Sequence, residues 1–192
     1  FEERKNWSQF WMVDPLDGTK EFVNRNGEFT VNIALIENQK PTLGVIYVPV
    51  TQELYFADEK AFKTTQLDDS KSLDSVISNS QLLPLSQSRK NHVIVGSRAH
   101  MSEETEAFIS GKRRQYGDLE FLSKGSSLKL CMIAEGIVDQ YPRFAPTSEW
   151  DTAAGQAIVV ASGGEVINWD TKEPLKYNKE DLTNAWFLAK RD

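Results

Sequence analysis

The sequence predicts a mixed α/β fold, in which an antiparallel β region precedes a half of alternating strands and helices. Apolar residues alternate with polar or small ones over Phe29 to Leu35 and again over Leu43 to Tyr47, and the turn Asn38-Gln39-Lys40-Pro41 separates the two stretches. This pattern is typical of a β-hairpin. After residue 90, strand patterns and helix patterns follow one another, which indicates a mixed layer of both elements.

Further strands are expected on both sides of the hairpin. The apolar run Phe10 to Val13 predicts a strand that ends at Asp14-Pro15, since proline interrupts regular pairing. Asp17-Gly18-Thr19 indicates a turn that enters a helix. Two more strands are expected over Glu53 to Ala57 and near Phe62.

The polar segment 64–90 has weak periodicity, so we expect a boundary in it between an α+β part, residues 1–90, and a smaller α/β half, residues 91–192. The elements expected in the second half are a strand at His92 to Gly96, a helix at Ser102 to Gly111 capped by Ser102, a helix at Ser126 to Glu135, a strand at Val138 to Tyr141, and a helix that opens at Asp151 and stops at Gly163-Gly164.

Composition excludes several classes of protein. The 192 residues are 40% hydrophobic and 10% aromatic, which suffices for a buried core and excludes a disordered or fibrous chain. The net charge of −6 argues against a broad basic face for a nucleic acid polymer. No stretch reaches the ~20 apolar residues of a transmembrane helix. The single cysteine, Cys131, is expected in the core and excludes an intrachain disulfide.

A single cysteine also fits a reducing compartment. We therefore expect the cytoplasm, and leave open a peripheral contact with the inner face of the membrane. The oligomeric state is left open as well.

The segment Asp14-Pro15-Leu16-Asp17-Gly18-Thr19 is the strongest candidate for chemistry. Its two carboxylates flank a proline-stiffened turn and can converge on one hard cation such as Mg²⁺. Gly18 lets the backbone pass close to a ligand, and the amides of Gly18 and Thr19 at a helix start favour an anionic group. The residues alone also allow a structural interpretation, in which Asp17 caps the helix and Asp14 ends the strand.

Asp151 has two interpretations as well. An acid at a helix start is usually a cap that interacts with the helix dipole. The small residues Thr152, Ala153 and Ala154 would also let this helix start approach a neighbouring element closely, as a third metal ligand requires.

Six ordered stretches of the chain together form a set of motifs. The first stretch is FWMVDPLDGTKEF at residues 10–22, continued by NGEFTVNIA at residues 26–34. The later segments GSRAH, GSSLK, YPR and EWDTAAG follow in the same order at residues 96–100, 125–129, 141–143 and 149–155. These stretches resemble the inositol monophosphatase superfamily, and within it the bacterial 3′(2′),5′-bisphosphate nucleotidases. The resemblance covers essentially the whole chain.

This resemblance implies a layered α-β-α-β-α sandwich of the inositol monophosphatase and fructose-1,6-bisphosphatase type. It also implies a lithium-sensitive phosphatase with two or three Mg²⁺ ions in the intact site. The implied substrate is a small-molecule bisphosphate nucleotide, adenosine 3′,5′-bisphosphate, a by-product of sulfate assimilation. Hydrolysis of its 3′-phosphate would give AMP and phosphate.

The resemblance also implies roles for single residues. Asp14 would bridge two metal ions, the backbone carbonyl of Leu16 would bind the first ion, and Asp17 and Asp151 would hold the second. Thr19 would orient the attacking water, so Thr19 and Asp14 are the expected catalytic residues.

Substrate contacts are implied at a larger set of positions. Lys129 would place a point charge on the second, 5′ phosphate, and Arg143 would be a further phosphate ligand. The structural alternatives are a solvated helix face for Lys129 and a helix-entry role for His100. The full expected set is Leu16, Asp17, Gly18, Thr19, Ser97, His100, Gly125, Ser126, Ser127, Lys129, Arg143 and Asp151.

The family pattern includes an upstream Ser-Glu-Glu-type motif, whose glutamate binds the first metal, and a further acid that pairs with the threonine. Glu3 lies 11 positions before Asp14, closer than the family spacing, so Glu2 and Glu3 are expected to be solvated surface acids. We therefore expect the N-terminal part of the fold to be absent, with residues 1–90 as the C-terminal portion of the family's N-terminal half. Two alternatives follow: a generic inositol monophosphatase, or a catalytically incomplete chain that only binds.

Overall fold

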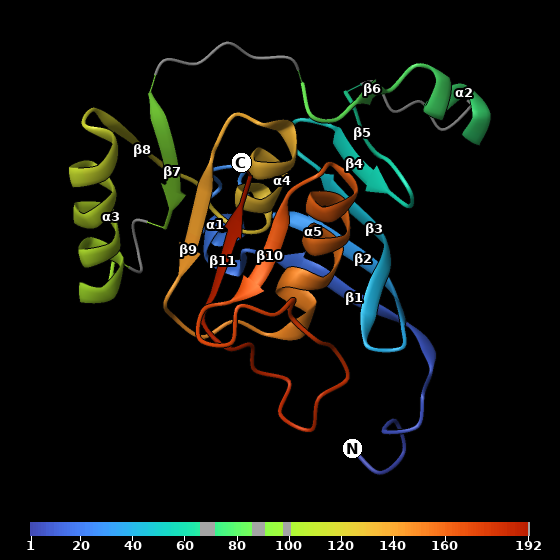
Figure 1. Cartoon of the computed structure of the whole chain (residues 1–192). Helices are drawn as coiled ribbons and strands as arrows, with labels where there is room; N and C mark the ends of the chain where they lie inside the picture. Colours follow the sequence, from blue (N-terminus) through green and yellow to red (C-terminus); the bar gives the residue numbers. More distant parts are fainter. Residues whose placement is uncertain (66–71, 86–90, 98–100, 192) are drawn as a thin grey trace.

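Two β-sheets enclose a pair of helices in the computed structural model, which describes residues 1–65, 72–85, 91–97 and 101–191 (Figure 1). The first sheet has six antiparallel strands in chain order: β1 (Gln9–Asp17), β2 (Thr30–Glu37), β3 (Lys40–Val48), β4 (Glu53–Ala57), β5 (Ala61–Thr64) and β6 (Gln81–Leu82). The short helix α1 (Thr19–Val23) follows β1, and α2 (Leu73–Ser78) precedes β6.

The expected strands of the first half are confirmed. In the hairpin of β2 and β3, Ile33 lies opposite Val45. Strand β1 continues past Asp14-Pro15, contrary to the prediction that it ends there. Its pairing with β2 shifts between Asp14 and Asp17, which places one extra residue on β1. Because β1 is an edge strand, this bulge accommodates the proline without breaking backbone hydrogen bonds between central strands of the sheet.

The second sheet is mixed, in the order β10-β11-β9-β7-β8. Strand β7 pairs in parallel with β8 and β9, whereas β9, β11 and β10 pair antiparallel. The strands are β7 (His92–Gly96), β8 (Leu119–Ser123), β9 (Gln140–Arg143), β10 (Glu165–Asn168) and β11 (Phe187–Lys190), and the helices of this half are α3 (Glu103–Tyr116), α4 (Leu128–Glu135) and α5 (Glu149–Ala161).

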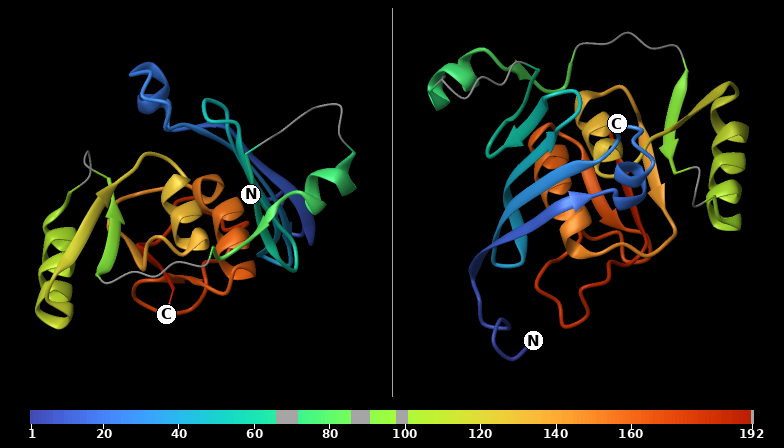
Figure 2. Two further views of the ribbon diagram at one scale, coloured as in Figure 1. Left: turned by 90° about the horizontal axis from the view of Figure 1, so that it is seen from above. Right: turned by 180° about the vertical axis from the view of Figure 1, so that it is seen from behind.

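Helices α4 and α5 form the layer between the sheets, and α3 lies on the far side of the second sheet (Figures 1 and 2). Helix α5 packs on β2 and β3. A Cβ atom on Gly44 of β3 would lie 2.3 Å from the carbonyl oxygen of Ala154, so only glycine permits this approach. One hydrophobic core runs through both sheets and includes Ile46, Ile133 and Phe187. Cys131 is buried in this core, as expected.

The outer face of the first sheet is apolar but only half-buried. Along β2 and β3, the residues that alternate with the core positions include Ile33, Leu35, Val45 and Tyr47. Trp11 on β1 is exposed beside them. The sequence of layers, a sheet, two helices, a sheet and a helix, agrees with the expected sandwich.

The three helices predicted in the second half are confirmed with shifted ends. Helix α3 continues through Gly111 to Tyr116 and ends where the chain turns at Gly117, whose φ is 74°. Helix α4 begins two residues after Ser126, whose φ of 39° is not helical. Helix α5 begins before Asp151, with Ser148 as its cap.

The prediction was wrong at other boundaries. The strand expected at residues 138–141 is β9, two residues later, and the segment 64–90 contains α2 and β6. Strands β8, β10 and β11 were not predicted at all. The boundary near residue 90 lies outside the described residues, and the division into two halves stays a prediction. No helix in the described part of the chain is long and apolar enough to cross a bilayer.

Candidate active site

Three carboxylates from distant parts of the chain meet at one point. Asp14 and Asp17 lie near the C-terminal end of β1, and Asp151 lies in the first turn of α5. One carboxylate oxygen from each of the three lies within 4.8 Å of the others. The packing of α5 on the first sheet therefore brings together the two motifs that the sequence singled out.

The bulge in β1 explains why Asp14 and Asp17 face the same side of the sheet. Residues three apart in a regular strand point to opposite faces. Here Asp14 lies opposite Asn32, and Asp17 lies opposite Thr30, both of which point inward from β2. The extra residue in β1 thus restores both carboxylates to the inner face.

Asp14 is buried, and its Oδ1 accepts a 3.0 Å hydrogen bond from the amide of Leu16. Burial raises the pKa of the Asp14 carboxyl above its usual value, and the neighbouring charge of Asp17 adds to the rise. The hydrogen bond from Leu16 therefore orients Asp14 and opposes the rise in its pKa, whereas burial and the charge of Asp17 make the negative charge of Asp14 unfavourable without a cation nearby.

Asp151 completes the capping box at the start of α5 and also belongs to the cluster. Its Oδ2 accepts a 2.7 Å hydrogen bond from the amide of Ser148, in a capping box at the helix start. Burial raises the pKa of Asp151 to about 6, the charges of Asp17 and Asp14 contribute to the rise, and Arg143 opposes it. The cap and the metal-ligand interpretations of Asp151 are therefore compatible.

Asp17 is held by Ser127, which the sequence analysis expected as a substrate contact, and by Asn32 and Thr30, which it did not select. Its Oδ2 accepts hydrogen bonds from the amide and hydroxyl of Ser127, both at 2.7 Å, and from Asn32 Nδ2 at 3.2 Å. Thr30 Oγ1 is a further donor at 3.3 Å. Thr30 and Asn32 are polar residues at two inward positions of β2, and that break in an otherwise apolar face was the signal available in the sequence.

The donor set of the cluster fits a divalent cation. All three side chains are carboxylates, which hard cations such as Mg²⁺, Ca²⁺ and Mn²⁺ prefer. Among the described residues, no lysine, arginine or histidine forms a salt bridge with Asp14, Asp17 or Asp151. A bound cation would remove the mutual repulsion that contributes to the raised pKa values of Asp14 and Asp151.

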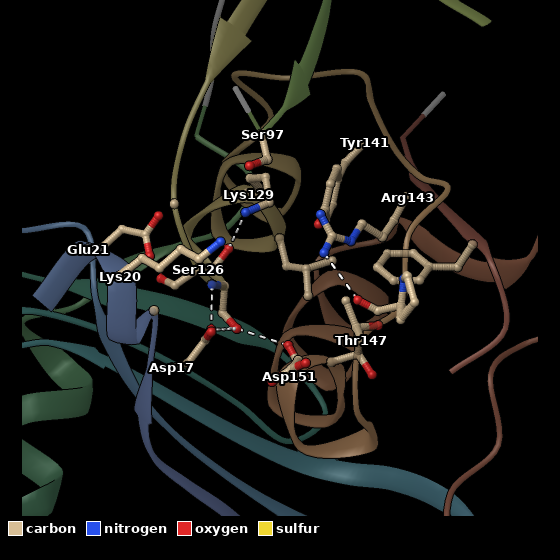
Figure 3. A pocket seen from close by; sticks show the side chains of 17 residues that line it. Asp17, Lys20, Glu21, Ser97, Ser126, Lys129, Tyr141, Arg143, Thr147 and Asp151 are labelled. Carbon is tan, nitrogen blue, oxygen red and sulfur yellow. Dashed lines mark hydrogen bonds between the residues drawn. The ribbon is translucent and has the colours of Figure 1, made fainter. Parts of the chain in front are cut away.

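A pocket opens beside Asp17 and Asp151 (Figure 3). Its walls come from the start of α1, the segment that leads into α4, and the end of β9 with the start of α5. In Figure 3, Lys129 and Arg143 lie above the two carboxylates. The lining consists of Asp17, Gly18, Lys20, Glu21, Ser97, Gly125, Ser126, Ser127, Lys129, Leu130, Tyr141, Arg143, Pro146, Thr147, Asp151, Thr152 and Phe187.

Lys129 is a buried cation in the wall of this pocket. Its side chain belongs to a residue that is 5% exposed, so the alternative of a solvated helix face is wrong. Its Nζ donates to the backbone carbonyls of Ser126 at 2.7 Å and Lys124 at 3.2 Å, and lies 5.3 Å from the centre of the Tyr141 ring. Burial lowers the pKa of Lys129 to about 8.

Arg143 adds a second positive charge. Its Nη2 donates to the carbonyl of Pro146 at 3.2 Å, and its buried Nε has no hydrogen-bond partner among the described atoms. Neither Lys129 nor Arg143 forms a salt bridge with a carboxylate within the described parts of the chain. The pocket thus combines an acidic floor with Lys129 and Arg143, neither of which pairs with a carboxylate that the structure describes.

The structure brings together most of the expected site residues. Nine of them line the pocket: Asp17, Gly18, Ser97, Gly125, Ser126, Ser127, Lys129, Arg143 and Asp151. Asp14 joins through the carboxylate cluster, whereas Leu16 and Thr19 do not line the pocket. Thr19 is the first residue of α1 and is exposed. His100 lies outside the described residues.

Gly18 shapes the approach between α1 and the segment before α4. Its φ of 89° is left-handed, and a Cβ atom there would lie 3.1 Å from the Cβ of Ser126. Glycine avoids both the backbone strain and the tight contact.

The acids expected at Glu2 and Glu3 are exposed, as predicted.

Comparison with known proteins points to one family. The family model described as "Inositol monophosphatase family" matches residues 2–190. The 3′(2′),5′-bisphosphate nucleotidase CysQ of Salmonella typhimurium is 44% identical over 188 residues, which cover 97% of this chain and 70% of the relative. CysQ of Escherichia coli strain K12 is 43% identical, with the same coverage.

Solved structures show the same relationship. The crystal structure of CysQ from Bacteroides thetaiotaomicron, described as a bacterial member of the inositol monophosphatase family, superposes with a TM-score of 0.95. Its sequence is 51% identical, and the match covers 100% of this chain and 73% of that one. An inositol monophosphatase from Zymomonas mobilis, 21% identical with a TM-score of 0.75, shares the fold, and the match covers 99% of this chain and 68% of that one. The chain belongs to the inositol monophosphatase family.

Proposed function

We propose that this protein is a Mg²⁺-dependent 3′(2′),5′-bisphosphate nucleotidase. It adds water to the 3′-phosphate ester of adenosine 3′,5′-bisphosphate and releases AMP and inorganic phosphate. The observation that carries this proposal is the acidic cluster of Asp14, Asp17 and Asp151 beside a pocket with Lys129 and Arg143, two cations that form no salt bridge among the described residues. A substrate with two phosphates requires both features.

The acidic cluster has the role of holding the metal. Asp14, Asp17 and Asp151, with the backbone carbonyl of Leu16, would hold two or three Mg²⁺ ions. When bound, Mg²⁺ supplies positive charge that neutralises the reacting phosphate and the departing oxygen. Thr19 holds and orients the attacking water through its hydroxyl.

The rest of the pocket binds the nucleotide. The amides of Gly18 and Thr19 receive oxygens of the 3′-phosphate, and Lys129 and Arg143 attract the 5′-phosphate. The remaining contacts are proposed for Ser97, His100, Gly125, Ser126 and Ser127. The cytoplasm is the proposed location.

The nucleotidase is favoured over a generic inositol monophosphatase by the similarity to known proteins. The nucleotidases named CysQ are 43–44% identical over nearly all of the chain. The staphylococcal inositol monophosphatase with bound 2′-AMP is 24% identical, which supports the fold alone.

Phosphate release is the direct test. The 192-residue chain is incubated with MgCl₂ and adenosine 3′,5′-bisphosphate, with AMP as the matched substrate that lacks the 3′-phosphate and inositol 1-phosphate as the competitor. We expect release from the bisphosphate, none from AMP, and loss of release with EDTA or in Asp14→Asn. Preference for inositol 1-phosphate would support the generic phosphatase instead.

Calorimetry with MgCl₂ distinguishes the proposed enzyme from a catalytically incomplete chain. A chain that only binds would show at most one Mg²⁺ site, through Asp17 and Asp151, and no turnover. Two or more occupied sites together with phosphate release would exclude that alternative.

A further inference from the structure

The Oδ2 atom of Asp17 is an unusually crowded hydrogen-bond acceptor. The amide and hydroxyl of Ser127 approach it at 2.7 Å, and Asn32 Nδ2 at 3.2 Å. The hydroxyl of Thr30 lies further away, at 3.3 Å. None of these bonds involves Oδ1, the other oxygen of the same carboxylate.

Asn32 and Ser127 also bond to each other, and together they connect three elements. Asn32 Nδ2 donates to Ser127 Oγ at 2.9 Å, and Ser127 Oγ lies 3.0 Å from the backbone carbonyl of Asp151. Asn32 belongs to β2, Ser127 is the residue before α4, and Asp151 lies in α5. The pair thus fixes Asp17 relative to the helix that carries Asp151.

Burial makes these contacts difficult to replace by solvent. Asn32 is 1% exposed and Ser127 is 3% exposed. If either donor were removed, Oδ2 would lose a directed partner, and the carboxylate would rotate or shift to recover one. A carboxylate held at one oxygen in this way presents its second oxygen in a fixed direction.

We propose that Asn32 and Ser127 are positioning residues that lock Asp17 through Oδ2, so that Oδ1 is presented to a divalent cation at the Asp14–Asp17–Asp151 cluster. This role presupposes the proposed metal-dependent function. Partners that orient metal ligands in this way typically contribute about 10- to 100-fold to metal affinity. In this role the pair acts through Asp17 and does not ligate the metal itself; the substrate contact proposed for Ser127 is a separate role.

The competing explanation is that the pair only stabilises the packing of β2 against α4 and α5. The control is therefore Gln156→Ala, which removes another buried polar side chain on α5. Gln156 Nε2 donates to the carbonyl of Leu175 at 3.3 Å, and its Oε1 accepts from the Tyr177 hydroxyl at 2.8 Å. Loss of these bonds lowers stability without a contact to Asp17.

Manganese binding to the 192-residue chain tests the proposal. Mn²⁺ affinity is measured by electron paramagnetic resonance for the wild type, Asn32→Ala, Ser127→Ala, Ser127→Thr and Gln156→Ala, with Asp17→Asn as the ligand control. We expect about 10- to 100-fold weaker binding in Asn32→Ala and Ser127→Ala. Ser127→Thr keeps the hydroxyl and Gln156→Ala keeps the pair, so both should bind Mn²⁺ within about threefold of the wild type.

Thermal unfolding followed by circular dichroism shows which variants are folded at the temperature of the titration. If one alanine variant is unfolded there, the other decides the outcome. Wild-type affinity in a folded Asn32→Ala or Ser127→Ala chain would overturn the positioning role, while binding that Asp17→Asn removes would leave the proposed function intact. Absence of Mn²⁺ binding in the wild type would overturn both.

Discussion

The amide of Ser148 donates a 2.7 Å hydrogen bond to Oδ2 of Asp151, so one carboxylate of the acidic cluster also caps the helix that carries it. The cap fixes the direction of the side chain at the start of α5. The same geometry places Asp151 within reach of Asp14 and Asp17. Asp151 therefore has two roles: it accepts a hydrogen bond at the start of the helix, and it belongs to the carboxylate cluster.

Substitutions at Asp151 should separate these two roles. Asp151→Asn keeps an oxygen that can accept the Ser148 amide but removes a charge from the cluster. We expect loss of phosphate release, with a thermal midpoint that is unchanged or raised because repulsion is relieved, and the same result for Asp14→Asn. Asp151→Ala also loses the cap, so its free energy of unfolding should be lower than that of Asp151→Asn by about 1 kcal/mol.

Circular dichroism melts and a phosphate-release assay on the same samples provide the comparison. A large fall in the midpoint of Asp151→Asn would show that the charge itself, rather than the cap, stabilises the fold.

Lys129 should make substrate binding depend on pH. Because burial lowers the pKa of Lys129 to about 8, the amine is charged at pH 7 and mostly neutral at pH 9. We expect KM for the bisphosphate to rise about tenfold between these pH values in the wild type. Lys129→Met, which has no titrating group there, should show a high KM without this rise. Equal pH profiles for the two proteins would contradict the role of Lys129.

The same shift has the opposite effect on stability. The pKa of Lys129 in the folded protein is lower than the value of about 10.4 for an unfolded chain. Between these values the unfolded chain binds more protons, so this group makes the free energy of unfolding increase with pH. Urea denaturation of the wild type and Lys129→Met at pH 8 and pH 10 measures the difference.

Gly44 should be intolerant of any side chain. An alanine Cβ there would lie 2.3 Å from the carbonyl oxygen of Ala154 and 2.9 Å from the Cβ of Ala157, so β3 and α5 would have to separate. We expect Gly44→Ala to lower the free energy of unfolding by about 1–3 kcal/mol. Gly111→Ala is the matched control, since its Cβ would meet nothing within 4 Å inside α3.

The control should be stabilised by about 0.5–1 kcal/mol, because alanine restricts the unfolded chain and favours a helix. Urea unfolding curves of both variants test the pair of predictions. A neutral Gly44→Ala would mean that the close approach of strand and helix is not required.

Glu149 should stabilise the segment around residue 178. Its fully buried carboxylate accepts the amides of Asn178 at 2.7 Å and Lys179 at 3.0 Å, and the Lys179 ammonium at 2.5 Å. We expect Glu149→Ala to lower the free energy of unfolding by about 3 kcal/mol, because it leaves buried donors unpaired. Glu165→Ala, in a pair with Lys190 at 3.5 Å where the glutamate is 56% exposed, should change it by less than about 0.5 kcal/mol.

Chemical denaturation of the two glutamate variants is the measurement. Similar losses in both would show that burial of the Glu149 pair does not determine its contribution.

Local patterns predicted the elements whose side chains repeat regularly. The hairpin of β2 and β3 and the helices α3, α4 and α5 follow from alternation or from helical spacing with caps. Strands β10 and β11 have four residues each and were missed, whereas β5 and β9 of the same length were predicted, so four residues give too little periodicity for a consistent prediction. Strand β6 has only two residues and depends on pairing with β5.

The candidate site, too, was predicted from the sequence only in part. Asp14, Asp17 and Asp151 were recognised from their motifs, and Lys129 and Arg143 from the family resemblance. The burial of Lys129 was not predictable from its helical position, because exposure depends on what packs over the helix. Asn32 lies in a strand with no motif of its own, and its bond to Asp17 exists only because β1 and β2 pair in one register.

The sequence by itself determined the chemistry of this protein: carboxylates at Asp14, Asp17 and Asp151, glycine at Gly18 and Gly44, and the family to which they belong. Tertiary structure alone decided that three carboxylates separated by as many as 137 positions meet within 4.8 Å, and that buried donors hold one of them. The physical reason is that residue type fixes which bonds a side chain can form, whereas burial and proximity depend on strand register and on the packing of α5 against the first sheet.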